Sequence, residues 1–310
     1  MECLGFVHPV NRFRSDFSTS PQGALARYLV QLEADGRSPH TIGQYRRHVR
    51  LLASWLSAEG LSSDLRDLDH EVLARFLASP AARTRPDGRP KKATAVNALR
   101  RSLRTIGAWV HGAGYVTSNP ARLVRRARYG SPPPRALSED EQQRLLETLA
   151  AAGGPEAERD HVLFATMLAT GIRVGSAVAL DVEDVDLDAG VLYLRQAKGD
   201  RPERVFLSRG IVEHLRRFIG GRATGPLFPA RGGRAMTTRH ANRRLQRWLK
   251  AAGIERPASC HSLRHAFATS MYRRCRDILL VKEALRHRSI VSTLVYAQVD
   301  EDRLRRAVGG

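Results

Sequence analysis

The chain has 310 residues and a mass of 34.4 kDa, and its 51 Lys and Arg against 31 Asp and Glu give a formal net charge of +20. Hydrophobic residues make up 42%, which excludes a disordered polybasic tail, and no apolar run approaches the roughly 18–20 residues that a membrane span needs. Three cysteines without a CxxC spacing argue against a disulfide framework and a structural zinc site, and Met1–Gly5 does not resemble the start of a signal peptide.

The charge indicates a polyanionic partner. A folded, strongly cationic chain gains affinity for nucleic acid because neutralised phosphates release their counterions. The alternative is an arginine-rich proteome encoded by a GC-rich genome, but acidic residues would then rise with the arginines, and here they do not. We therefore expect a cytoplasmic, nucleoid-associated protein that binds DNA and no membrane.

The first half of the chain predicts a helical DNA-binding domain over residues 21–121, after an N-terminal arm of residues 1–20. Apolar side chains recur every three or four positions in four stretches, Ser38-Pro39 and Asp69 are helix-starting signals, and residues 80–92 are expected to be a basic loop. Few acids separate the bases, so we interpret this basic face as DNA-facing rather than merely solvated. Its expected contact residues are Arg46, Arg47, Arg50, Lys91, Lys92, Arg100 and Arg101.

Residues 122–137, with five arginines and the run Pro132–Pro134, predict a linker, because consecutive prolines are extended. A second domain over 138–299 then opens with a capping box at Ser138 and contains a helix that ends at Gly171. Residues 184–208 alternate in a way that predicts short antiparallel strands, and the rest is helical, followed by a tail at 300–310. The fold class is thus mainly α with a small antiparallel β-sheet, in a two-domain clamp.

One helix of the second domain has an apolar side and an arginine side. Leu245, Trp248 and Leu249 form the apolar side. A helix of this kind fits a DNA groove. The residues expected to face DNA are Arg239, Arg243, Arg244 and Arg247.

Three segments carry the chemistry: Ala169–Gly175, His261–Thr269, and Leu285–His287 followed nine residues later by Tyr296. Together they resemble the tyrosine recombinase (phage integrase) family, in its simpler Xer-like form, over most of the chain. The resemblance implies a nucleophile at Tyr296, without metal or any other cofactor. The residues that match the remaining catalytic positions are Arg173, Lys198, His261, Arg264 and His287.

These residue types suit phosphodiester cleavage by tyrosine. A phenol has a pKa near 10, so only about one part in a thousand is ionised at pH 7, and it needs a base or a cationic field. Two arginines can hold the nonbridging oxygens of the transition state. A lysine in a turn can protonate the leaving 5′-oxygen, and histidines can orient the phosphate and move protons. His265 is interpreted as a structural or supporting residue.

Two positions depart from the family pattern. Where the family has an acid three residues after the first arginine, this chain has Ser176, and the carboxylates that could compensate are Asp160, Glu183 and Asp184. Where it has a glycine before the later histidine this chain has Arg286, which implies an altered turn or an extra phosphate contact. We interpret the chain as an active but divergent enzyme.

By this resemblance, the expected function is site-specific strand exchange through a 3′-phosphotyrosine and a four-way junction. The expected partner is double-stranded DNA with inverted half-sites, bound by a homodimer and, in the synapse, by a tetramer. An accessory protein or a partner recombinase is left open. Two alternatives are a type IB topoisomerase-like relaxing enzyme and a DNA-binding regulatory protein with a degenerate active site.

Overall fold

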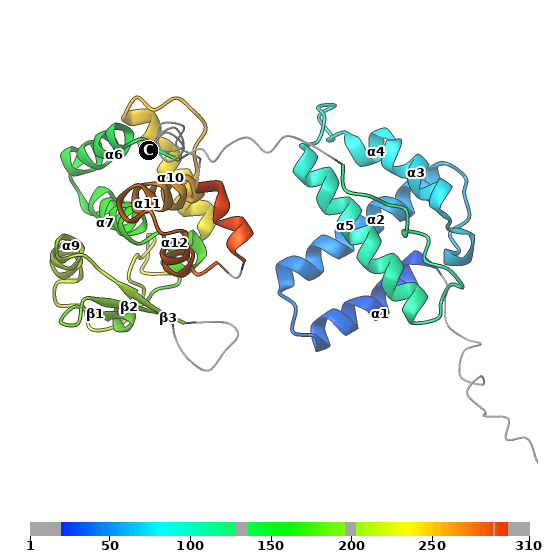
Figure 1. Ribbon diagram of the computed structural model, residues 1–310, viewed down its shortest axis with the longest axis horizontal. Coiled ribbons are helices and arrows are strands. Elements are labelled where there is room, and N and C mark those ends of the chain that lie inside the picture. Colours follow the sequence, from blue (N-terminus) through cyan, green and yellow to red (C-terminus); the bar gives the residue numbers. More distant parts are fainter. Residues whose placement is uncertain (1–19, 128–135, 196–202, 288, 297–310) are drawn as a thin grey trace, which may run out of the picture. The chain divides into compact units, whose positions relative to one another are not determined.

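The computed structural model describes residues 20–127, 136–195, 203–287 and 289–296. The chain forms two compact units, residues 1–131 and 132–310 (Figure 1). Residues 1–19 of the predicted N-terminal arm, residues 128–135 of the predicted linker, Lys198 and the C-terminal tail lie outside the described residues. None of the described helices is long and apolar enough to cross a membrane.

The first unit is entirely helical in its described part, and side chains cap several of its helices. Ser38 accepts a hydrogen bond from the backbone N–H of Thr41, and Asp69 accepts one from Val72 at 2.8 Å, as their residue types predict. The elements are α1 (Pro21–Ala34), α2 (Pro39–Ala58), η1 (Leu65–Asp67), α3 (His70–Ala78), α4 (Pro80–Arg83) and α5 (Ala93–Gly112).

The expectation of a plain loop over residues 80–92 was wrong at its start. Pro80 begins the short helix α4, with Ser79 as the residue before it, and Ala82 in this helix is fully buried. Proline suits the first position of a helix because its missing N–H is unpaired there anyway. Pro80 therefore indicated the start of a helix. The glycine and prolines that follow it are typical of loops, and they led to the prediction of a loop.

Aromatic side chains fill the core of the first unit. Trp55 of α2 packs on Phe76 of α3 with ring centroids 5.4 Å apart, and Phe76 is fully buried. The ring centroids of Tyr28 on α1 and Trp109 on α5 are 5.1 Å apart, so the first and last helices of this unit are in contact. Aromatic pairs of this spacing stabilise a core beyond their buried area. The core leaves the arginines of α2 and α5 on the outside of the unit.

The second unit combines helices with a small sheet, which confirms the predicted fold class. Ser138 and Glu141 form the predicted capping box of the first helix, with both hydrogen bonds in place. The elements are α6 (Glu139–Ala152), α7 (Pro155–Thr170), α8 (Val174–Ala177), η2 (Val182–Asp184), β1 (Val185–Asp186), β2 (Val191–Leu194), β3 (Glu203–Phe206), α9 (Arg209–Ile219), α10 (Thr238–Ala251), α11 (Cys260–Cys275), α12 (Ile278–Leu285), η3 (Ile290–Ser292) and η4 (Leu294–Tyr296).

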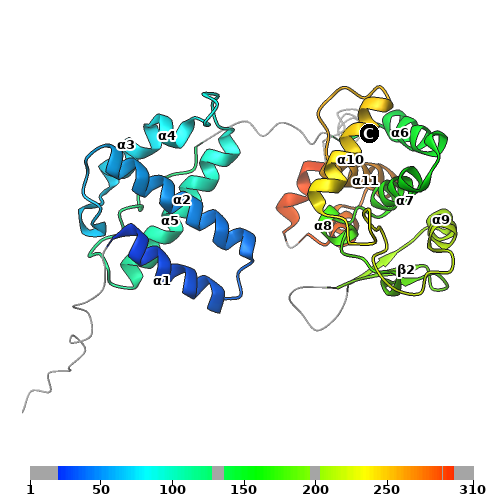
Figure 2. The same cartoon turned by 180° about the vertical axis from the view of Figure 1, so that it is seen from behind.

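The sheet has the order β1-β2-β3, is antiparallel throughout, and lies at one end of the unit beside α9 (Figure 2). Val185 pairs with Leu192, and Leu194 pairs with Glu203. Leu192 and Leu194 face the core, so β2 joins the sheet to the helical part of the unit. The turn that connects β2 to β3 contains Lys198 and is not described.

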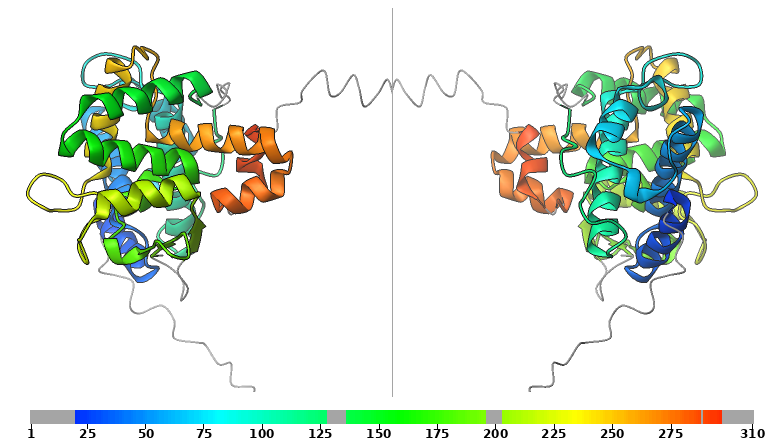
Figure 3. Two further views of the ribbon diagram at one scale, coloured as in Figure 1. Left: turned by 90° about the vertical axis from the view of Figure 1, so that its left-hand side faces the viewer. Right: turned by 90° about the vertical axis from the view of Figure 1, so that its right-hand side faces the viewer.

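Helix α7 forms the centre of the second unit and α11 packs against it. The first half of α11 contributes Cys260, Leu263 and Ala266 to the main core. Its second half carries a separate cluster in which α12 and η4 pack beside it (Figure 3). Helix α11 therefore connects the core of the unit with the segment that ends at Tyr296.

Gly171 fixes how closely α7 and α11 approach. It ends α7 in the left-handed conformation, with φ of 62°. A Cβ atom at this position would lie 2.3 Å from the ring of Phe267 on α11, which no real structure tolerates. Only glycine meets both requirements here.

Candidate active site

Three of the predicted catalytic residues meet in one cavity of about 440 Å³. Its polar lining includes Arg173, His261, Arg264 and Ser176, and its walls include Ile172, Val174, Gly175 and Cys260. The cavity lies where the chain leaves α7 and where α11 begins. Two segments about 90 residues apart in the sequence thus come together.

Local structure explains how the cavity residues are placed. Arg173 is the residue before α8 and has extended backbone angles, so its exposed side chain leaves the helix end. Helix α11 starts at Cys260, with Ser259 and Ser262 bonded to each other's backbone N–H groups. His261 and Arg264 then lie three positions apart, which places them on one side of the helix.

Arg264 is the best-buried charge in the cavity, at 2% exposure. One terminal nitrogen donates to the carbonyl of Gly171 at 2.5 Å, and the other donates to the carbonyl of Leu285. Its Nε–H is buried and has no hydrogen-bond partner in the described part of the chain. Burial, and then the charge of Arg173, lowers the pKa of Arg264 to about 10. It stays protonated at neutral pH, and its unpaired donor suits an anionic oxygen.

His287 and Tyr296 are linked through Thr293, which is fully buried. The Thr293 hydroxyl lies 2.9 Å from Nδ1 of His287, and the Thr293 carbonyl accepts the backbone N–H of Tyr296 at 3.0 Å. Burial, followed by the charges of Arg264 and Arg173, lowers the pKa of His287 to about 4. His287 is therefore neutral at pH 7.

The Tyr296 hydroxyl is held by a histidine that the sequence did not mark as catalytic. Tyr296 is 6% exposed, and its Oη lies 2.5 Å from Nδ1 of His265. Burial raises the pKa of Tyr296, and the charge of Arg264 opposes that shift. The ring of His261 stands edge-on to that of His265, with centroids 4.4 Å apart. His265 follows His261 by four helical positions, which was the available signal for this pairing.

Lys198 lies outside the described residues, but both strands that lead to its turn are anchored. Arg195, just after β2, bonds to Asp184 at 2.7 Å and to Asp181 at 2.9 Å. Glu203, the first residue of β3, forms an ion pair with Arg286 at 3.1 Å.

The structure resolves what Arg286 does at the position where the family has glycine. It ends α12 in the left-handed conformation with φ of 53°, so the turn keeps the backbone angles that glycine prefers. Besides Glu203, the guanidinium donates to the carbonyl of Arg204 at 2.5 Å, which links α12 to β3.

None of the three carboxylates considered as substitutes for the acid missing at Ser176 forms an ion pair with Arg173. Asp160 and Asp184 bond to arginines other than Arg173, and Glu183 is exposed. Arg173 has no ion pair with any described carboxylate. No carboxylate of the described residues lines this cavity, which is therefore cationic.

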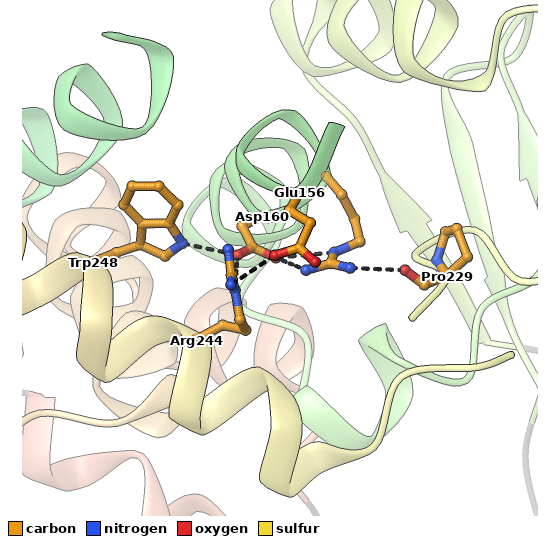
Figure 4. Close-up of polar contacts among 6 residues, drawn as sticks. Glu156, Asp160, Pro229, Arg244 and Trp248 are labelled. Atoms are coloured by element: carbon orange, nitrogen blue, oxygen red, sulfur yellow. Dashed lines mark hydrogen bonds and ion pairs between the residues drawn. The ribbon is translucent and has the colours of Figure 1, made fainter. Parts of the chain in front are cut away.

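Arg244 does not belong to an exposed arginine face, so its predicted DNA contact is corrected. Its Nε bonds to Asp160 at 2.5 Å, its terminal nitrogen bonds to Glu156 at 2.9 Å, and its side chain is 12% exposed (Figure 4). Trp248 donates to the same Asp160 oxygen at 2.8 Å, and Arg159 bonds to the other at 2.6 Å. A carboxylate 84 positions away thus holds this guanidinium inside the unit.

The other predicted DNA contacts lie on the surfaces of their units. Those with exposed side chains are Arg46, Arg47, Arg50, Lys92, Arg101, Arg239, Arg243 and Arg247. In the first unit Arg100 and Arg101 line a groove of about 420 Å³ with Arg104, Arg126 and Asn97. Lys91 differs, because its ammonium donates to the carbonyl of Ala81 at 2.8 Å.

Both units of the chain match models of known protein families. The model of the phage integrase family matches residues 135–303, and that of the phage integrase N-terminal SAM-like domain matches residues 25–111. Tyrosine recombinase XerC of Neisseria gonorrhoeae is 30% identical, over 90% of this chain and 92% of the relative. XerC of Pelobacter propionicus is 31% identical with the same two coverages.

Solved structures share the fold. The XerH recombinase in a post-cleavage complex with palindromic difH superposes with a TM-score of 0.74 at 22% identity, over 93% of this chain and 84% of the other. The lambda integrase tetramer bound to a Holliday junction has a TM-score of 0.68 at 21% identity, with coverages of 92% and 83%.

Proposed function

Because this chain belongs to the phage integrase family and is a tyrosine site-specific recombinase, we propose that it cuts and rejoins DNA through a covalent 3′-phosphotyrosine at Tyr296. The observation that carries this proposal is the cavity lined by Arg173, His261 and Arg264 and by no described carboxylate. The buried Tyr296 connects to it through ring contacts, from Tyr296 to His265 and from His265 to His261. A scissile phosphate supplies the anion that this cavity lacks.

Each side chain has a part in the proposed reaction. Arg173 and the unpaired Nε–H of Arg264 bind the nonbridging oxygens, whose charge grows in the transition state. His261 borders the same cavity, and the neutral His287 donates to the phosphate or the leaving group. Lys198 is the expected proton donor to the 5′-oxygen, which leaves as a hydroxyl.

The assembly follows from what the relatives bind. The XerH structure contains a recombinase on palindromic difH DNA, and the lambda integrase structures contain a dimer on a core site and a tetramer on a Holliday junction. We infer that this chain binds inverted half-sites as a homodimer and pairs two such dimers in a synaptic tetramer. The exposed arginines of both units supply the phosphate contacts, which make binding salt-dependent.

Covalent trapping tests this proposal. The protein is incubated with nicked duplexes drawn from the flanks of its own gene, and denaturing gels reveal protein–DNA adducts. We expect an adduct with the wild type, none with Tyr296→Phe, and an undiminished adduct with Tyr272→Phe, a matched change near the same cluster. An adduct that survives Tyr296→Phe would overturn the assignment of the nucleophile.

A second measurement separates strand exchange from relaxation. Four-way junctions accumulate from two paired sites only if strands are swapped between duplexes. Relaxation of supercoiled DNA without any junction would instead support the topoisomerase-like alternative.

A further inference from the structure

The reacting oxygen of Tyr296 has one direct polar neighbour among the described residues, and it is His265. The distance from Oη to Nδ1 is 2.5 Å, a short contact for a phenol and an imidazole. His261 has no hydrogen bond to this oxygen, although its ring lies beside that of His265. The group in place to receive the phenolic proton is therefore His265.

Packing on three elements fixes this contact. Tyr296 lies in a cluster with Ala268 of α11 and with Val281 and Leu285 of α12, all of them buried. Its backbone N–H is bonded to Thr293, which sets the direction of the short helix η4. His265 comes one residue after Arg264, so the two side chains point about 100° apart around α11. Arg264 lines the cavity and His265 meets the nucleophile.

The protonation states suit a hydrogen bond donated by the phenol. Burial first, then the charges of His261, Arg264 and His287, lower the pKa of His265 to about 4, so its ring is neutral at pH 7. Burial raises the pKa of Tyr296, which keeps its proton in the resting enzyme. The hydroxyl then donates to Nδ1, and the other ring nitrogen carries the imidazole hydrogen.

A base this weak cannot ionise a resting phenol, and it does not need to. The affinity of the phenolic oxygen for its proton falls steeply as the bond to phosphorus forms, so transfer in the transition state becomes favourable. The imidazolium that results lies beside Arg264 and His261, which favours return of the proton when the strands are rejoined.

Resting on the proposed function, we propose that His265 is a further catalytic residue, the general base for Tyr296. In the cleavage step Oη bonds to phosphorus, the bond from phosphorus to the 5′-oxygen breaks, and the phenolic proton moves to Nδ1 of His265. The 5′-oxygen takes its proton from a separate acid, the expected Lys198. Rejoining reverses both transfers.

The test is single-turnover cleavage of a nicked substrate by wild type and His265→Asn. Asparagine places an amide oxygen close to the position of Nδ1 and cannot take a proton. We expect the rate to fall by about 10²–10⁴-fold, as for loss of a general base, while the affinity for the same DNA changes by less than about twofold. A rate within about threefold of wild type would overturn the proposal.

A substrate with sulfur in place of the bridging 5′-oxygen separates the two proton transfers. A thiolate leaves without an acid, so sulfur should restore Lys198→Ala and leave His265→Asn as slow as before. Restoration of His265→Asn by sulfur would assign His265 to the leaving group instead.

The pH profile on the sulfur substrate provides a readout that a purely structural role does not change. The wild-type rate should be level between about pH 6 and 8, whereas the His265→Asn rate should rise about tenfold per pH unit as solvent removes the proton. If His265→Asn does not fold, His265→Gln is the second variant. A wild-type rate that itself rises tenfold per unit contradicts the proposal without any variant.

The two proposals fail in different ways. A wild type that forms no Tyr296-dependent adduct rejects the proposed function. A wild type that forms one, together with a His265→Asn variant that cleaves equally fast, rejects only the role of His265.

Discussion

Within residues 132–310, the guanidinium groups of Arg159 and Arg244 are bonded differently from that of Arg264. Arg159 and Arg244 share Asp160, which is fully buried and accepts a bond from each. Arg264 is just as buried, yet its terminal nitrogens bond only to the backbone carbonyls of Gly171 and Leu285. Arg159 and Arg244 thus bond directly to a carboxylate, whereas no described carboxylate forms an ion pair with Arg264.

This difference shows which arginine is available to a ligand. A guanidinium on a carboxylate is neutralised, and its donors are already used. A guanidinium on carbonyls is oriented but keeps its full charge, which makes it a preorganised site for an anion. Arg159 and Arg264 are buried to a similar degree, at 5% and 2% exposure, so the direct ion pair is what separates the structural arginine from the one assigned to catalysis.

Removing the shared carboxylate should have the largest effect on stability. Asp160→Asn leaves the buried Arg159 without a counter-charge and leaves Arg244 with only the mostly exposed Glu156, and we expect a loss of about 3–5 kcal/mol in the free energy of unfolding. Urea denaturation measures it. Glu156→Gln is the control, because Glu156 is mostly exposed and should cost less than about 1 kcal/mol. Equal losses of stability for both variants would mean that the buried Asp160 contributes no more than the exposed Glu156.

Arg264→Gln should show the opposite pattern. It removes a buried charge that forms no ion pair with a described carboxylate, so folding stability should not fall as it does for Asp160→Asn. Cleavage should fall by about 10²–10³-fold, as for loss of one transition-state donor. Single-turnover adduct formation measures the rate, with Arg217→Gln, an exposed change on α9 outside the predicted DNA contacts, as the control for net charge. Normal cleavage by Arg264→Gln would refute the assignment.

The ion pair between Arg256 and Glu141 should give a smaller, pH-dependent effect. Hydrogen bonding to Arg256 is the main reason that the pKa of Glu141 falls to about 2. Because the unfolded carboxyl titrates near 4.3, this stabilisation is complete above that pH and is lost as the pH falls toward 2. Arg256→Gln should therefore cost on the order of 2 kcal/mol at pH 7. Thermal unfolding of both proteins should converge in acid, and a constant difference would contradict this origin.

Substitutions of Arg286 should change the free energy of unfolding least. Comparing two variants separates the loss of the ion pair from the strain of the turn. Both Arg286→Gly and Arg286→Ala remove the ion pair with Glu203. Only glycine adopts a φ of 53° without strain, so the alanine variant should be less stable by about 1 kcal/mol. Denaturant midpoints measure the difference. An alanine variant as stable as the glycine variant would mean that the turn relaxes.

Local signals predicted most of the fold. Capping residues such as Ser38, Asp69 and Ser138 act within a few positions, so the sequence alone locates the helices they start. The short helix at Pro80 was missed because the loop residues after it dominate the local composition.

The site was predictable where residue types repeat a family motif and not where distant segments meet. Arg173, His261 and Arg264 were recognised from their motifs and do share a cavity. The ion pairs of Arg244 depend on a helix 84 positions earlier, and the contact of His265 depends on how η4 packs on α11. Periodicity describes one helix at a time and contains no information on such pairings.

The close approach at Gly171 has a consequence for genetics. Its carbonyl orients Arg264, and its missing side chain makes room for Phe267, three residues further along α11. A random screen for lost recombination should therefore return Gly171→Ala with the same phenotype as Arg264 variants, although the two positions are 93 residues apart. Such an allele would mimic an active-site mutation while leaving every catalytic side chain intact.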